Sequence, residues 1–136
     1  MAATLKAKVE QRIDRRKKSD VFLPKEFRDL GGEDQVLRAL RELTRERRLV
    51  RLGYGVYARA KVSSISGRVM LANPSGFNGV ARQALNKLGV KWEPTKEERA
   101  YNEGRSTQVP VNAAVNVKGR FSRQLRYGNS ELLLER

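Results

Sequence analysis

The amino-acid sequence predicts an α+β protein organised around its residues 20–59. A short β-prone run precedes Pro24, two helical patterns follow with Gly31-Gly32 between them, and two apolar runs are then joined by Gly53-Tyr54-Gly55. A strand, two helices and a tight hairpin in this order are typical of a winged helix-turn-helix. The rest of the chain predicts a small α/β lobe, with one main helix packed on a three-stranded antiparallel meander.

The composition narrows the class of function. The 136 residues include 29 Lys and Arg against 15 Asp and Glu, a net charge of +14. This charge predicts salt-sensitive binding to nucleic acid, although ribosomal and membrane-surface proteins share it. Cys and His are both absent, which excludes disulfides, thiolate metal sites and the commonest general base. We therefore expect no catalytic residues, no metal and no cofactor.

The sequence contains no signal-peptide core at its start and no apolar run long enough to cross a membrane. We expect a cytoplasmic protein of a bacterium or phage with no membrane partner. Aspartates occur only at positions 14, 20, 29 and 34, so no catalytic constellation is apparent. The hydroxyls of Ser106 and Thr107 are either a nucleophile site or, as we favour, a strand-entry cap.

The first helix is predicted over residues 4–17, because Leu5, Val9 and Ile13 recur at steps of four. The Lys and Arg residues on its other faces form either a solvated surface or, at residues 15–18, a contact to the DNA backbone. A second, two-turn helix is predicted from Pro24 to Leu30 and is ended by the two glycines.

The helix from Glu33 to Glu46 is the predicted recognition helix. Its apolar residues fall on one side and Arg38, Arg41 and Arg45 on the other. Arginine suits base and phosphate contacts because its planar fork makes bidentate hydrogen bonds. The alternative is that Glu42 pairs with Arg38 or Arg45 on an ordinary solvated surface.

The runs 49–52 and 56–58 predict a hairpin that acts as a basic wing with Tyr54 at its tip. Together, the predicted helices and wing define the candidate DNA-binding residues. These are Lys25, Arg38, Arg41, Arg45, Arg48, Arg51, Tyr54 and Arg59.

The C-terminal lobe begins with a linker-like stretch, residues 61–72, followed by an amphipathic helix over residues 77–88. A short strand at residues 90–92 and a capping box from Thr95 to Glu98 come next. From Val111 the period changes to two, and turns at 118–120 and 128–129 predict the meander. Its Arg120, Arg123 and Arg126 form a second candidate basic surface.

We divide the chain into a winged-helix domain, residues 1–61, and the C-terminal lobe, residues 62–136. The first range has 17 basic and 9 acidic residues, a net of +8, and the second has 12 and 6, a net of +6. Both parts therefore carry enough positive charge to meet nucleic acid.

Several segments resemble AbiEi-type antitoxins of bacterial type IV toxin–antitoxin systems. The residues that resemble their winged-helix domain are Val21-Phe22, Phe27, Leu30-Gly31, Val36, Ala39-Leu40-Arg41-Glu42-Leu43, Leu49-Val50-Arg51-Leu52-Gly53 and Gly55-Val56-Tyr57. Residues Gly104-Arg105-Ser106-Thr107-Gln108-Val109-Pro110 resemble a segment near the last hairpin of short relatives. The resemblance implies an operator-binding autorepressor. In longer members the C-terminal part antagonises a nucleotidyltransferase-like toxin.

Our leading functional expectation is a non-enzymatic, sequence-specific transcriptional regulator that binds double-stranded DNA. Because one helix and one wing supply few contacts, we expect a homodimer on an inverted repeat. Two alternatives remain open. One is an antitoxin or anti-defence inhibitor that masks a partner enzyme such as a cognate toxin, and the other is a structured-RNA binder.

Overall fold

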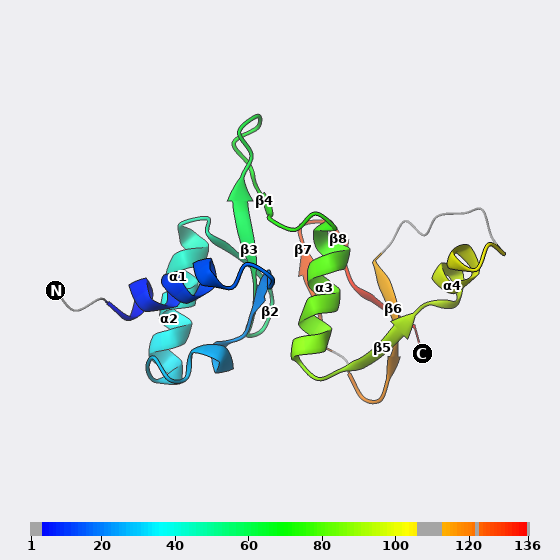
Figure 1. Cartoon of the computed structure of the whole chain (residues 1–136), viewed down its shortest axis with the longest axis horizontal. Helices are drawn as coiled ribbons and strands as arrows, with labels where there is room; N and C mark the ends of the chain where they lie inside the picture. The colour runs from blue at the N-terminus through cyan, green and yellow to red at the C-terminus, as the bar shows by residue number, and fades with distance from the viewer. Residues whose placement is uncertain (1–3, 106–112, 122, 136) are drawn as a thin grey trace.

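The computed structural model describes residues 4–105, 113–121 and 123–135 and has an α+β fold (Figure 1). In this part of the chain, no helix is long and apolar enough to cross a membrane. The helices are α1 (Leu5–Arg15), the 3-10 helix η1 (Pro24–Phe27), α2 (Glu33–Arg45), α3 (Gly76–Lys87) and α4 (Lys96–Asn102). The strands are β1 (Val21–Phe22), β2 (Leu49–Gly53), β3 (Val56–Val62), β4 (Val69–Leu71), β5 (Lys91–Pro94), β6 (Ala114–Lys118), β7 (Arg126–Tyr127), β8 (Ser130–Glu131) and β9 (Leu133–Glu135).

The central sheet has the strand order β1-β3-β2, and β4 also pairs with β3. All of these pairs are antiparallel. Because side chains alternate along a strand, β3 sends Tyr57 to one face and Val56 and Ala58 to the other. Tyr57 packs with α1 and α2, whereas Val56 and Ala58 pack with α3 and the C-terminal strands.

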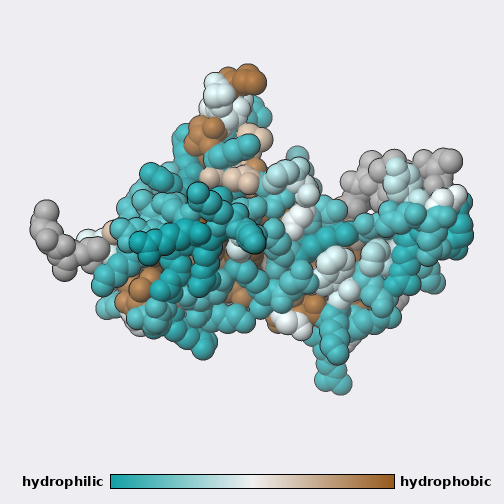
Figure 2. Space-filling view, in the orientation of Figure 1, coloured by the Kyte–Doolittle hydropathy of each residue, from teal (hydrophilic) through white to brown (hydrophobic). Residues whose placement is uncertain are grey.

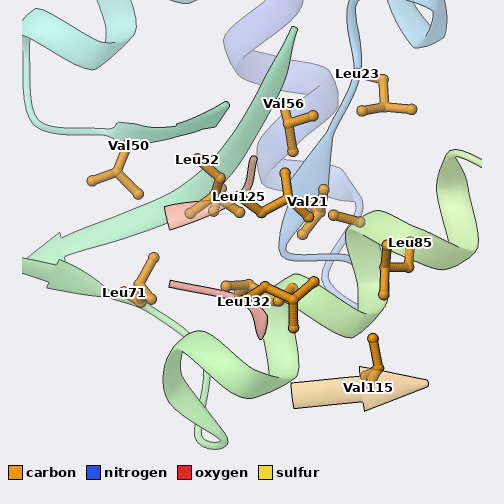
Figure 3. Packing of buried hydrophobic residues seen from close by; sticks show 14 of the residues in the cluster. Val21, Leu23, Val50, Leu52, Val56, Leu71, Leu85, Val115, Leu125 and Leu132 are labelled. Atoms are coloured by element: carbon orange, nitrogen blue, oxygen red, sulfur yellow. The ribbon is translucent and has the colours of Figure 1, made fainter. Parts of the chain in front are cut away.

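The hydrophobic core on the α3 side of the central sheet joins the two predicted domains. It combines Val21 and Leu52 of the central sheet with Leu85 of α3, Val115 of β6 and Leu125 (Figure 3). Polar contacts reinforce this junction: Gln83 of α3 accepts a hydrogen bond from the Asp20 main-chain N–H at 2.9 Å. The sheet is therefore covered on both faces.

The predicted helix at residues 24–30 is shorter than expected, with η1 covering only Pro24–Phe27. The Glu26 carboxylate accepts a hydrogen bond from the Leu23 N–H at 2.7 Å, which fixes the start of this single turn. Thr95 begins α4 as expected, and its hydroxyl accepts from the Glu98 N–H at 3.2 Å.

The linker predicted at residues 61–72 is wrong. β3 continues to Val62 and β4 returns beside it, with Val62 paired to Val69 and Ala60 to Leu71. The two strands and their turn form a hairpin, residues 60–71, which projects from the body of the molecule (Figure 1). We call it the arm.

The predicted antiparallel meander is also wrong, although a three-stranded sheet exists. Its order is β5-β6-β9, with β5 antiparallel and β9 parallel to β6. β7 and β8 form a separate hairpin, because the flanking Leu125 and Leu132 are buried in the core shared with the central sheet. The predicted strand start at residues 111–112 and the segment 106–110 lie outside the described residues.

Candidate nucleic-acid interface

The outer face of α2 presents three exposed arginines, Arg38, Arg41 and Arg45. The opposite face, which includes Val36, Leu40 and Leu43, is buried against α1 and the sheet. Steps of three and four residues keep the arginines on one side of the helix. They line an open hollow of about 410 Å³ together with Asp34 and Leu37.

Arg38, Arg41 and Arg45 form no ion pairs with the part of the chain that the structure describes, whereas cations such as Arg12 and Arg59 do. Within the described ranges, the pairing with Glu42 considered from the sequence is therefore not formed. Three neighbouring unpaired guanidinium groups repel one another and favour an anion close by. The outer face of α2 therefore has the electrostatics of a phosphate-binding surface.

Two cations of α1, Lys6 and Arg12, by contrast form ion pairs with other elements of the fold. Arg12 makes a bidentate pair with Asp29, at 2.6 and 2.7 Å. This hydrogen-bonded pair lowers the pKa of the Asp29 carboxyl to about 2 and raises the pKa of the Arg12 guanidinium. Lys6 pairs with Glu46, whose hydrogen bond raises the Lys6 pKa. These contacts fix α1 against η1 and the end of α2.

The turn between α2 and β2 contains an unusual backbone conformation. Arg47 has a φ of 64°, in the left-handed region that usually favours glycine. Arg47 N–H donates to Thr44 and Arg48 N–H to Leu43, which closes the end of the helix. Arg47 therefore holds a strained backbone conformation while its side chain is exposed.

The β2–β3 turn carries Tyr54 at its tip, 77% exposed. Gly55 has a φ of 65°, the positive value that this tight turn requires. Arg123 donates to the Tyr54 carbonyl, and its guanidinium lies 5.9 Å from the centre of the Tyr54 ring. The C-terminal segment therefore packs directly beside the turn.

An arginine-lined hollow of about 640 Å³ opens at this contact; we call it the turn hollow. Arg51 and Tyr54 line it from the central sheet, and Arg123, Arg126 and Tyr127 line it from the C-terminal segment. Arg51 donates to Gly53 O at 3.2 Å. The fold thus joins two basic regions that the sequence placed about seventy residues apart.

Close backbone packing holds the turn hollow together. A Cβ atom at Gly53 would lie 2.5 Å from the main-chain oxygen of Gln124, so only glycine fits there without a shift. Arg120 borders a second hollow of about 460 Å³, which Lys91, Lys118 and Arg123 also line. Arg123 therefore lines both basic hollows. Lys91 and Lys118 belong to the second hollow, although the charge pattern of the sequence did not identify them as candidate residues.

Arg59 has a structural environment. Its Nη2 atom donates to three main-chain carbonyls in the last turn of α1 and the segment that leads to β1, and its Nε atom donates to Asp20 at 3.2 Å. The carbonyls belong to Ile13, Arg16 and Ser19, at 2.8, 2.9 and 3.1 Å. Because Nε and Nη2 both donate to groups of the protein itself, we leave Arg59 out of the candidate interface.

The two remaining predicted contacts are exposed. The Lys25 ammonium donates to the carbonyl of Lys87 at 3.1 Å. Arg48 lies beside the last residues of β3, at the base of the arm, where its carbonyl accepts from the Ala60 N–H at 3.0 Å. In the part of the chain that the structure describes, no group of three or more His, Cys, Asp and Glu side chains could hold a metal ion.

Comparison with known proteins gives a family for the chain. Searches of curated proteins and of solved structures found no match. A family model does match, over residues 8–136, which is nearly the whole chain: DUF6088, a family of unknown function. The chain therefore belongs to the DUF6088 family.

Proposed function

We propose that this protein is a non-enzymatic, sequence-specific DNA-binding regulator with an N-terminal winged helix-turn-helix. The observation that carries the proposal is the unpaired arginine face of α2, supported on the sheet β1-β3-β2. A helix, a strand, two further helices and a hairpin with this strand order support the winged-helix assignment. In it, η1 and α2 are the helix-turn-helix and the β2–β3 turn is the wing.

In this proposal α2 enters the major groove. Arg38, Arg41 and Arg45 then reach guanine edges or flanking phosphates, for which the guanidinium fork is suited. The turn hollow holds the backbone, since Arg51, Arg123 and Arg126 surround a space open to solvent. Phosphate contacts fix the register of the helix while base contacts supply sequence preference.

A homodimer on an inverted repeat would double these few contacts. The resemblance to AbiEi-type antitoxins supports an operator near the protein's own gene and therefore autorepression. Under this proposal residues 62–136 are more than an appendage, because they contribute Arg123 and Arg126 to the backbone contact.

The test is a gel shift with duplex DNA from upstream of the coding region. Arg38→Ala with Arg41→Ala should weaken binding at least tenfold, since each base contact supplies about 1–3 kcal/mol of discrimination. Arg99→Ala with Arg105→Ala removes the same charge around α4 and should leave affinity nearly unchanged.

Three results would contradict the proposal. The first is equal affinity for the upstream fragment and for unrelated duplexes of the same length. The second is an equal loss from both double variants, which would indicate a response to net charge alone. The third is competition by structured RNA as effective as by duplex DNA, which would favour an RNA partner.

A further inference from the structure

The arm projects from the body of the molecule (Figure 1) and carries exposed aliphatic side chains. Ile65, at its tip, is 97% exposed, and Val62 and Met70 are 48% and 42% exposed. Figure 2 shows hydrophobic residues at the end of this projection, well clear of the body. The strand register puts Val62 and Met70 on opposite faces of the hairpin. Exposed apolar side chains therefore lie on both faces of the arm and at its tip, which indicates a contact segment.

The tip is ordered by its own hydrogen bonds. The Ser63 N–H donates to Arg68 O at 2.8 Å, and the Gly67 N–H donates to Ser63 O at 2.9 Å. The Ser63 hydroxyl accepts from the Ile65 and Ser66 N–H groups, both at 3.2 Å. Ile65 is therefore held outward on a built turn.

The base of the arm is anchored on both sides. Its Ala60 N–H donates to Arg48 O at 3.0 Å, and the Tyr127 hydroxyl donates to Val69 O at 2.6 Å. The arm thus leaves the molecule beside the end of α2, where Arg45, Arg47 and Arg48 are exposed. Its direction is fixed relative to the proposed recognition helix.

The charge of the arm favours a polyanion over a second copy of this chain. Residues 60–72 include Lys61 and Arg68 and no acidic residue. Both cations are exposed, and neither forms an ion pair with any residue that the structure describes. A second copy with a net charge of +14 would repel them, whereas phosphates would bind them.

The dimensions fit the minor groove of duplex DNA. From Ala60 to Ser63 the paired strand of the arm extends roughly 10 Å at about 3.3 Å per residue, and Ile65 lies beyond it on the closed turn. The minor groove is about 7.5 Å deep, so Ile65 can reach its floor. Aliphatic side chains that enter this groove unstack a base step and bend the duplex.

The spacing of the two turns fits as well. The β2–β3 turn and the arm lie at opposite ends of β3 (Figure 1). The strand spans roughly 20 Å, and the turn residues at both ends bring the distance between Tyr54 and Ile65 to roughly 30 Å. This is close to the ~34 Å of one duplex turn, after which the minor groove recurs on the same side.

We propose that the arm is a second wing that inserts Ile65 into the minor groove, with Lys61 and Arg68 on the adjacent phosphates. The inference rests on the proposed DNA-binding function. α2 then occupies one major groove, and the two turns of β3 contact the minor grooves on either side.

The experiment uses the full chain and a duplex selected with it from a randomised library. Ile65→Ser should weaken binding about tenfold, equivalent to about 1.4 kcal/mol, and should reduce DNA bending in a circular-permutation gel. Lys61→Gln with Arg68→Gln should lower the salt slope of log K by about 2. The matched controls, Tyr101→Ser and Lys96→Gln with Arg105→Gln, should change neither affinity nor bending.

The possible outcomes distinguish failure of the second wing from failure of the proposed DNA-binding function. If Arg38→Ala with Arg41→Ala abolishes binding while Ile65→Ser leaves affinity and bending unchanged, the second wing is refuted and the recognition helix stands. If Ile65→Ser alters only the oligomeric state in light scattering, the arm contacts a second copy instead. If selection with the wild-type chain enriches no duplex, the DNA-binding function itself fails.

Discussion

Replacing Arg59 with methionine separates a structural role from a DNA-contacting role at one predicted contact residue. The Arg59 side chain is 22% exposed, and its guanidinium lies 5.4 Å from the centre of the Phe22 ring. Methionine preserves much of the apolar contact but removes the donors to Asp20 and to the three main-chain carbonyls. Asp20 retains a hydrogen bond from Asn73 at 2.7 Å.

The size of the effect follows from these contacts. A hydrogen bond from a charged donor contributes about 1.5–3 kcal/mol, but water reaches part of this site and the bonds share one donor group. We therefore expect a total loss of roughly 3 kcal/mol in the free energy of unfolding. For a chain of 136 residues, this corresponds to a fall in Tm of about 10 °C.

Thermal unfolding followed by circular dichroism measures the change in Tm, and a gel shift well below the Tm measures the change in DNA affinity. Arg59→Met should lower the Tm but leave the affinity of the folded protein unchanged. The control, Arg51→Met, should leave the Tm unchanged but weaken DNA binding, because Arg51 is exposed at the turn hollow. A variant at Arg59 with an unchanged Tm and weakened DNA binding would refute this reasoning.

Two further predictions concern stability. Arg47→Gly should raise the free energy of unfolding by about 1 kcal/mol, because glycine adopts positive φ without strain. If the Arg47 charge contacts DNA, both Arg47→Gly and Arg47→Asn should weaken DNA binding. Unchanged affinity in both variants would exclude that contact. The paired Asp29 carboxyl, with its pKa lowered to about 2, should stabilise the fold above about pH 4 and lose this contribution as the pH falls from about 4 to 2. Asp29→Asn should therefore flatten the pH dependence of urea unfolding in that window, and an identical acid profile would contradict the pairing.

Elements with strong local patterns were predictable from the sequence. The apolar positions of α2 and α3 repeat at helical spacing, and both helices lie within about a residue of their expected bounds. The glycines at 53 and 55 likewise predicted the β2–β3 turn. In these segments the residues that determine the element lie within the element itself, so the sequence is informative.

Non-local pairing was not predictable in the same way. The alternation in β6 indicates a strand but does not identify its partners, and the parallel pairing with β9 depends on where Leu125 and Leu132 are buried. Ser63, Ser64 and Ser66 suggested a linker, whereas the hydroxyls of Ser63 and Ser66 accept main-chain hydrogen bonds that build the tip of the arm.

The candidate site was predicted in part. The outward arginines of α2 were identified by periodicity, but the joining of Arg51 with Arg123 and Arg126 depends on tertiary packing. For Arg59 a local signal was available: it lies two residues after Tyr57 on β3, and strand alternation puts both side chains on the face covered by α1 and α2.

The shared core on the far face of the central sheet has a mechanical consequence. Val21, Leu52 and Val56 are buried against α3 and the C-terminal strands, so separating the C-terminal part would expose apolar surface on the sheet that carries α2. The turn hollow would be dismantled in the same event, since its arginines come from both sides. If the protein binds DNA as proposed, a ligand that displaced the C-terminal strands would weaken the contact with the phosphate backbone. Bound DNA would in return stabilise the position of those strands, as reciprocal linkage requires.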